Sequence, residues 1–300
     1  MWVFNKRKFE TFTFDVTIGT YATDIPGITL TFSRWAIVRW GDGSSDVLTS
    51  TAEKTHTYSS NDTFKVTIEV PLLTTITSFQ ADNAFIDGTI DFAGLTELSV
   101  INIYTNSLLT EIANIESTLT SLLVYDCDIT GICDLSSATL AITNAFSFYG
   151  NANLTDFSFQ NVANTITNNL FLNDCDLTGT LDFSYVEITA LFIDIFNNPN
   201  LTSVSWKTGT VIQANFSGND CALDAILNSA NITAANSCLI NLQDNAMSAT
   251  EVDNTIIGVE ADGTSNGTLQ LQGTNAARTA ASDAANTALG GRGWTVTTTP

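Results

Sequence analysis

The sequence predicts a mainly β protein, with an all-β domain over residues 1–72 and a parallel β-solenoid with a C-terminal cap over residues 73–300. Two observations carry this prediction: apolar residues alternate with polar ones near the N-terminus, and a short motif then recurs to the end of the 300-residue chain. Short helices are expected only in the last coils. With 44% hydrophobic residues, the chain has enough apolar material for a packed core.

Residues 1–72 contain two stretches in which every second residue is apolar. This period of two places the apolar side chains on one face of a strand and the polar ones on the other. Each stretch is therefore expected to form a half-buried strand. The apolar positions are Phe12, Phe14, Val16 and Ile18 in the first stretch, and Phe64, Val66, Ile68 and Val70 in the second.

Between these strands lie a Trp-Gly-Asp-Gly-Ser turn at residues 40–44 and a His-Thr-Tyr step at residues 56–58, followed by the strand of residues 62–70. This series resembles a PKD (polycystic-kidney-disease) domain over residues 10–71. The resemblance implies an immunoglobulin-like β-sandwich with a spacer or adhesion role, and a structural role for His56. The chain departs from that family because it lacks the usual Asp-Phe between Trp40 and Gly41, so a shorter strand is expected there.

The rest of the chain repeats the motif apolar-x-apolar-x-x-(Asn or Cys) at intervals of 21 to 29 residues. Such a fixed period is typical of solenoids. The copies begin with a weak one at Phe79-x-Ala81 to Ala84. They continue at Ile101 to Asn106, Leu122 to Cys127, Phe146 to Asn151, Leu170 to Cys175, Ile193 to Asn198, Ala214-x-Phe216 to Asn219, Ile240 to Asn245, and Leu269 to Thr274.

The spacing and the alternation of Asn with Cys resemble leucine-rich repeats over residues 73–296. The resemblance implies one short parallel strand per coil, with both apolar side chains pointing inward and the Asn or Cys serving inner backbone groups. The stretch after each turn is too short for a helix. Two similar strings, residues 126–131 and 174–179, lie 48 residues apart, which indicates two alternating coil types.

The last two coils carry helix signals instead. Ser248-Ala-Thr-Glu251 is a capping-box sequence, and an alanine-rich helix is expected over residues 276–289 with Gly290-Gly291 as its stop. A final strand near residues 294–296 is expected to cover the open end of the solenoid, as terminal repeats must.

The charge is distributed unevenly along the chain. Residues 1–65 hold seven basic and seven acidic residues, whereas residues 66–300 hold 24 acidic residues against Lys207, Arg278 and Arg292, which gives the net charge of −21. Because such an acidic surface repels the phosphate backbone of DNA and RNA, no nucleic-acid partner is expected. No membrane insertion is expected either, because no run of 18 apolar residues exists, and residues 1–8 do not have the pattern of a signal peptide.

The composition argues against an enzyme. His56 is the only histidine, so Ser44 and Ser45 have no second histidine to activate them, and no carboxylate pair stands in a recognisable motif. No cofactor is expected, although Asp42 and Asp46 are weak candidates for a calcium site. The five cysteines fit no zinc spacing and are expected to be buried free thiols, which favours synthesis in a reducing cytosol. They are Cys127, Cys133, Cys175, Cys221 and Cys238.

The strand pattern also predicts an exposed aromatic column. If the two apolar residues of each motif point inward, the residue that follows them points outward, and parallel strands place these outward residues about 4.8 Å apart. An exposed aromatic stripe suits sugar rings or a protein partner, but it could equally stiffen the sheet or pack against the N-terminal domain or a second subunit. The column reads Tyr104, Tyr125, Tyr149, Asn173 with Phe171 beside it, Phe196, Ser217, Gln243 and Gln272.

Together these features predict a non-enzymatic structural or adhesion protein of a bacteriophage virion, such as a capsid decoration, head fibre or tail-associated protein. Residues 1–72 would anchor it to other virion or surface proteins. The acidic solenoid would be displayed outward for partner or host-glycan binding, in many copies or as a homo-oligomer. The alternative is an extracellular adhesin or carbohydrate-binding protein of the bacterial surface, and an enzyme such as a polysaccharide lyase ranks third.

Overall fold

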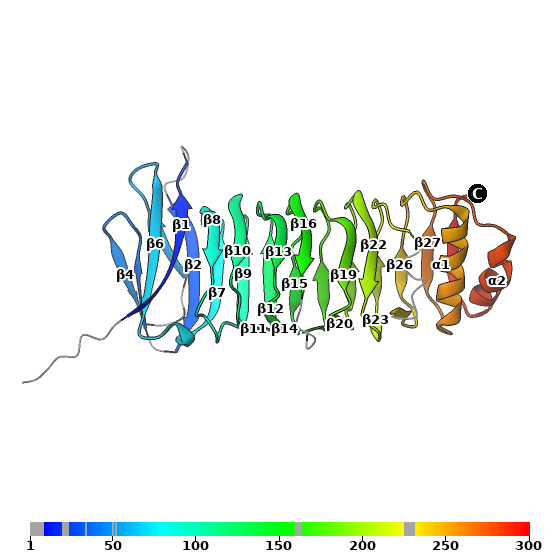
Figure 1. Cartoon of the computed structure of the whole chain (residues 1–300), viewed down its shortest axis with the longest axis horizontal. Coiled ribbons are helices and arrows are strands. Elements are labelled where there is room, and N and C mark those ends of the chain that lie inside the picture. The colour runs from blue at the N-terminus through cyan, green and yellow to red at the C-terminus, as the bar shows by residue number, and fades with distance from the viewer. Residues whose placement is uncertain are drawn as a thin grey trace, which may run out of the picture.

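A computed structural model describes residues 9–19, 24–33, 35–49, 51, 53–159, 164–224 and 232–300. Residues 1–8, which are predicted not to form a signal peptide, lie outside this range. The protein is mainly β and elongated, with the N-terminal strands at one end, a row of stacked coils in the middle and two helices at the other end (Figure 1).

The N-terminal strands form two layers. Both predicted alternating strands are present and pair antiparallel with each other, with Phe12, Phe14 and Val16 of the first and Val66 and Ile68 of the second buried between the layers. One layer contains β1 (Glu10–Thr17), β6 (Thr63–Val70), β3 (Ala36–Arg39) and β4 (Ser45–Leu48), and the other contains β2 (Asp24–Phe32) and β5 (Glu53–Thr57).

Both layers continue into the solenoid. After a 3-10 turn (Leu73–Thr75), β7 (Ile76–Asp82) pairs antiparallel with β2 and parallel with β9 (Val100–Tyr104). On the opposite layer, β8 (Ile86–Asp91) pairs antiparallel with β1 and parallel with β10 (Leu108–Ala113). Rings of Phe12 and Phe14 contact that of Phe79 across this junction, at centroid distances of 5.4 and 5.6 Å. The N-terminal strands therefore cover the first coil's apolar end.

Each complete coil contributes up to three short parallel strands, not the single strand that was predicted. The additional strands bury residues such as Leu109 and Leu140, but they are rich in Thr, Asn and Asp and lack the apolar-x-apolar-x-x-(Asn or Cys) spacing, so they fall outside the repeated motif. The face that begins with β7 and β9 is called the first face. It continues with β12 (Ser121–Tyr125), β15 (Ala145–Ser147), β18 (Asn169–Phe171), β21 (Phe192–Asp194), β24 (Asn215–Ser217), β26 (Leu239–Asn241), β27 (Thr268–Leu271) and β28 (Thr295–Thr298). The other faces contain β13 (Thr130–Asp134), β16 (Asn153–Ser158), β19 (Thr178–Phe183) and β22 (Asn200–Trp206), and β11 (Thr118–Leu119), β14 (Thr139–Ile142), β17 (Asn164–Ile166), β20 (Val186–Ile188), β23 (Thr210–Ile212) and β25 (Ile232–Ala234).

The predicted register of the first face is right except in the coil of Phe216. Phe216 pairs with Ile193 and Ile240, so Phe216, not Ala214, is the first inward residue of its coil. Gly218 then takes the second inward position, where a Cβ would come within 2.9 Å of neighbouring Phe216 and Leu223 side-chain atoms. The motif requires an apolar residue at both inward positions, so a coil with glycine at the second position does not match it in the correct register. The motif's polar residue is consequently Cys221 in that coil, and Asn275 instead of Thr274 in the last.

A ladder of Asn and Cys side chains runs inside the turns of the stack. The Asn151 amide donates to the carbonyls of Val124 and Phe148, both at 2.7 Å, and its Oδ1 accepts the Ile129 N–H at 3.1 Å. Such bonds satisfy backbone groups that the turn leaves without partners. The ladder comprises Asn106, Cys127, Asn151, Cys175, Asn198, Cys221, Asn245 and Asn275.

The cysteines of this ladder are donors, not reactive groups. Cys175 Sγ donates to the Phe148 carbonyl at 3.2 Å, and burial raises the pKa of Cys127, Cys175 and Cys221 to about 12. All five cysteines are free and buried, as predicted. Because Asn and Cys alternate from residue 106 to residue 245, the prediction of two alternating coil types is also confirmed.

The C-terminal cap is partly as predicted. Helix α1 (Ala249–Ala261) begins with the Ser248–Glu251 capping box, and β28 pairs with β27. The second helix is shorter than predicted: a 3-10 turn (Ala280–Ser282) precedes α2 (Asp283–Gly291). The reason is Asp253, which accepts hydrogen bonds from the backbone of Thr279 and the hydroxyl of Ser282 and so holds the preceding segment in another conformation. The chain turns at Gly293, with φ of +81°.

Candidate ligand-binding face

Three tyrosines stack on the outer face of the long first sheet. Tyr104 and Tyr125 pair directly in register and lie with ring centroids 4.9 Å apart and planes 5° apart. Tyr149 extends the stack at 4.7 Å and 16° from Tyr125. All three side chains are half-buried. The predicted column is thus formed by the first three of its aromatic residues.

The stack exposes ring edges more than ring faces. Nearly parallel rings can come within 5 Å of each other only when their faces overlap. Each ring inside the stack therefore has its faces covered by its neighbours and presents its edge and hydroxyl group outward. The uncovered faces are the two terminal ones, on Tyr104 toward β7 and on Tyr149 toward β18.

A hollow lies beside the terminal face of Tyr149. Asn173 occupies the next place in the column, where a fourth ring would otherwise continue the stack. The hollow has a volume of about 250 Å³ and brings the predicted residues Phe171 and Phe196 together with Tyr149. Its lining residues are Tyr149, Phe171, Asn173, Asp194 and Phe196. Sequence alone had not included Asp194 in the site.

Beyond this hollow the column differs from the prediction. The Asn197 N–H donates to the Asn219 carbonyl at 3.1 Å, just as the Asp174 N–H donates to the Phe196 carbonyl at 3.1 Å. Asn219 therefore follows Phe196 in the column, and the predicted Ser217 lies one outward position earlier on its strand. The two-residue register error at Phe216 caused this misplacement.

A second hollow lies at the other end of the stack. It has a volume of about 290 Å³ and lies where β2 and β5 join the solenoid sheet. The sequence did not predict this hollow, because the repeat gives no sign that the N-terminal strands β2 and β5 extend this sheet. The lining residues are Gly27, Thr29, Glu53, Gln80, Ala81, Asp82 and Tyr104.

The face is acidic and its phenols stay neutral. Burial, reinforced by the neighbouring tyrosines and by Asp82 and Asp126, raises the pKa of Tyr125 to about 12. Burial also raises the pKa of Tyr104 and Tyr149, with Asp82 and Asp126 respectively adding to the effect. The Tyr104 and Tyr149 hydroxyl groups bond to Asp82 and Asp126, and at neutral pH the Tyr125 hydroxyl group can donate a hydrogen bond to a ligand.

Burial raises the pKa of Asp194 in the first hollow, while a hydrogen bond from Ser217 opposes the rise. Its Oδ1 also accepts a long hydrogen bond from Asn215 at 3.4 Å. A carboxylate has about four acceptor sites, so Asp194 can accept further hydrogen bonds from a ligand in the hollow.

The single histidine belongs to a packed cluster at the N-terminal end. His56 stacks on Trp40 at a centroid distance of 4.8 Å, and its Nε2 contacts Asp42 at 2.8 Å and Ser44 at 3.4 Å. The same nitrogen serves both contacts, so Asp42 does not orient the ring from its far side as a catalytic triad requires. This geometry fits the structural role that was expected of His56.

The two calcium candidates already have protein partners. Asp42 accepts the Ser44 N–H at 2.9 Å and its hydroxyl at 2.6 Å, whereas Asp46 accepts the Trp40 indole N–H at 2.9 Å. Within the described part of the chain, no three His, Cys, Asp or Glu side chains gather in a way that could hold a metal ion. Calcium binding at Asp42 and Asp46 stays a prediction.

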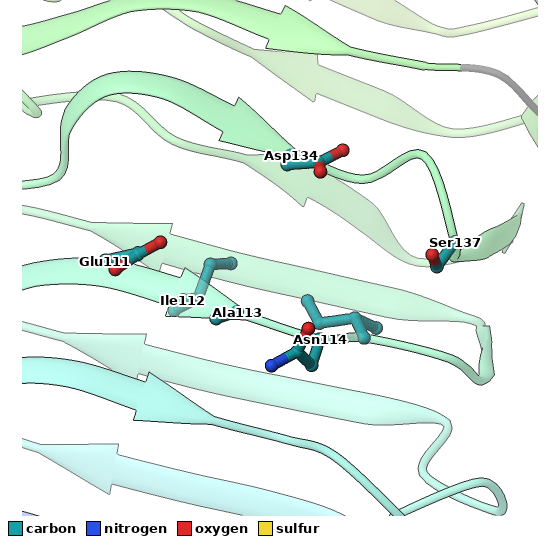
Figure 2. Close-up of a pocket in the computed structure, with 7 residues that line it drawn as sticks. Glu111, Ile112, Ala113, Asn114, Asp134 and Ser137 are labelled. Atoms are coloured by element: carbon teal, nitrogen blue, oxygen red, sulfur yellow. The ribbon is translucent and has the colours of Figure 1, made fainter.

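A smaller hollow of about 130 Å³ lies on another face of the coils, between β10 and β13. Figure 2 shows Glu111 and Asp134 on separate strands, with carboxylates that do not converge on one point. Glu111 accepts a hydrogen bond from Thr89 and Asp134 accepts one from the Ser136 backbone. Each carboxylate therefore has a hydrogen-bond partner within the protein itself.

Comparison of the chain with protein-family models, with curated proteins and with solved structures finds no match. In the described residues, neither helix is long and apolar enough to cross a membrane.

Proposed function

We propose that this protein is a non-enzymatic display protein that binds glycans through the outer face of its long sheet. The stack of Tyr104, Tyr125 and Tyr149, with a hollow at each end, is the observation that carries the proposal. Aromatic rings contact the apolar faces of sugars, while neighbouring carboxylates, amides and phenols can exchange hydrogen bonds with sugar hydroxyls. The face combines both kinds of group along the solenoid.

The same proposal assigns the protein to a bacteriophage virion, with residues 1–72 as the anchor. Two observations support this assignment. Residues 1–65 have no net charge whereas residues 66–300 carry −21, so the neutral end can approach a partner without repulsion. The five buried free thiols suit folding in a reducing cytosol before release. A bacterial cell-surface adhesin is the second candidate, since the outward-facing tyrosine stack would serve it equally well.

Glycan binding is tested with the full chain on a panel of immobilised neutral and acidic oligosaccharides. The double variant Tyr125→Ala/Tyr149→Ala removes two of three stacked rings, and binding is expected to weaken at least tenfold, about 1.4 kcal/mol. The matched control is Gln243→Ala/Gln272→Ala, which truncates two polar residues further along the same column and is expected to leave binding unchanged.

Thermal unfolding of both double variants separates binding from a stiffening role. If the tyrosine variant loses stability while its glycan binding stays at the wild-type level, the stack serves the sheet alone and the proposal is wrong. Mass spectrometry of purified phage particles and of bacterial envelopes tests the location. Protein found in the particles supports the virion assignment, and protein confined to the envelope supports the adhesin.

A further inference from the structure

The aromatic column has one interruption between aromatic neighbours, at Asn173. Tyr149 lies one coil before it and Phe196 one coil after it. Two strand spacings separate these neighbours, about 9.5 Å in total. One ring-shaped group fits between them at the spacing of the existing stack, whose ring centroids lie 4.9 and 4.7 Å apart.

We infer that the hollow at Asn173 is a subsite for one neutral pyranose ring, which completes the stack between Tyr149 and Phe196. This inference rests on the proposed glycan-binding function. Phe171 borders the same hollow, and Asp194 supplies a carboxylate. The sugar presents its C–H faces to the aromatic rings and its hydroxyl groups to Asp194 and Asn173.

The polar groups favour a sugar over an aromatic side chain of a protein partner. Asp194 is half-buried, and among the described residues its side chain accepts hydrogen bonds from Ser217 and, at the long distance of 3.4 Å, from Asn215. Several hydroxyl groups of a pyranose can donate to it, whereas a Phe ring brings no donor and a Tyr ring only one. A ligand that excludes water from a carboxylate without supplying new hydrogen-bond donors loses binding free energy.

The charge of the surroundings selects a neutral sugar. Asp174 lies beside Asn173, which donates to its carboxylate at 2.6 Å, and Asp194 lies in the hollow itself. A uronic acid or sialic acid would bring a further negative charge among these carboxylates, inside a region with a net charge of −21. Acidic sugars are therefore expected to bind more weakly than neutral sugars of the same size.

The test variant places a new side chain in the hollow instead of removing one of the residues that line it. Asn173→Phe places a ring in the gap and completes the stack, so the folded protein is expected to keep or raise its melting temperature. The control is Asn219→Phe in the same column. Asn219, like Asn173, donates to the aspartate that follows it, and a ring there covers the far side of Phe196 without entering the hollow.

Isothermal titration of the full chain uses glucose, galactose, mannose and N-acetylglucosamine oligomers of two to six residues, with galacturonic acid oligomers as the acidic comparison. Asn173→Phe is expected to weaken binding of the best neutral oligomer at least tenfold, and Asn219→Phe less than twofold. Equal binding by wild type and Asn173→Phe overturns the subsite. If Tyr125→Ala/Tyr149→Ala still weakens binding in that case, the proposed function stands without it.

Three further outcomes also overturn the inference. If N-acetyltyrosinamide competes with the sugar for the hollow more strongly than neutral monosaccharides do, its occupant is an aromatic side chain of a protein. If wild type binds only the galacturonic acid oligomers, the neutral-sugar subsite is wrong and the glycan-binding function stands. If it binds neither the neutral nor the acidic oligomers, both are wrong.

Discussion

At the scale of single residues, hydrogen bonds rather than catalytic chemistry explain the most perturbed carboxylate. Burial alone would raise the pKa of Asp42, but hydrogen bonds from Ser44 and His56 lower it to about 2. Its side chain remains 22% exposed, so solvent screens part of the effect. Asp42 thus fixes the turn that carries it against His56, in the cluster that the Trp-Gly-Asp-Gly sequence had indicated.

Asp42→Asn is expected to reduce stability at pH 6 by about 1 kcal/mol, after allowance for screening. Because the pKa of Asp42 is lower in the folded chain than its ordinary 3.8, its charge stabilises the fold above about pH 4. This contribution is lost as the pH falls from about 4 to 2. Urea unfolding at several pH values should therefore show the difference between wild type and variant shrinking toward pH 2.

Ser44→Ala removes one donor to the same carboxylate and should show the same pH trend with a smaller amplitude. A difference between wild type and Asp42→Asn that stays constant down to pH 2 would contradict this explanation of the pKa.

At the scale of elements, the sequence predicted the strands that follow a strict apolar pattern and missed the others. Ile101, Leu122, Phe146, Leu170 and Ile193 stack in register as expected. The strands of the other faces escaped notice because many of their residues are polar and their hydrogen bonds go to the next coil, which no local pattern reveals.

The site was predictable to a similar extent. Period two placed Tyr104, Tyr125 and Tyr149 on the outer face, and their stacking follows from register. The hollows were not predictable. One hollow depends on the side-chain orientations of the aromatic residues around Asn173. The other depends on β2 and β5, which extend the sheet across its junction with the solenoid.

The Asn ladder holds successive coils together, so its loss should be costly. Asn151→Ala would leave the Val124 and Phe148 carbonyls and the Ile129 N–H without these partners in a buried turn. The free energy of unfolding is expected to fall by about 3 kcal/mol, measured by urea unfolding. Asn153→Ala is the control, because the exposed Asn153 side chain donates to the Asp128 side chain, and its loss should cost under about 1 kcal/mol. Equal losses in the two variants would contradict the ladder's role.

At the scale of the whole molecule, continuity of the sheets matters most. Two layers run from the N-terminal strands into the coils, and the strands and helices at the two ends cover the apolar interior (Figure 1). A solenoid needs such covers, because its terminal coils would otherwise expose their interior to water. The result is a rod on which one long outer face carries the tyrosine stack and both of its hollows.

The most direct test of glycan binding by this face is a crystal structure of the full chain with the neutral oligosaccharide that binds it best. We expect density for a sugar ring between Tyr149 and Phe196, in contact with Phe171 and within hydrogen-bond distance of Asp194. Oligosaccharide density elsewhere on the molecule, with this hollow unoccupied, would contradict the account.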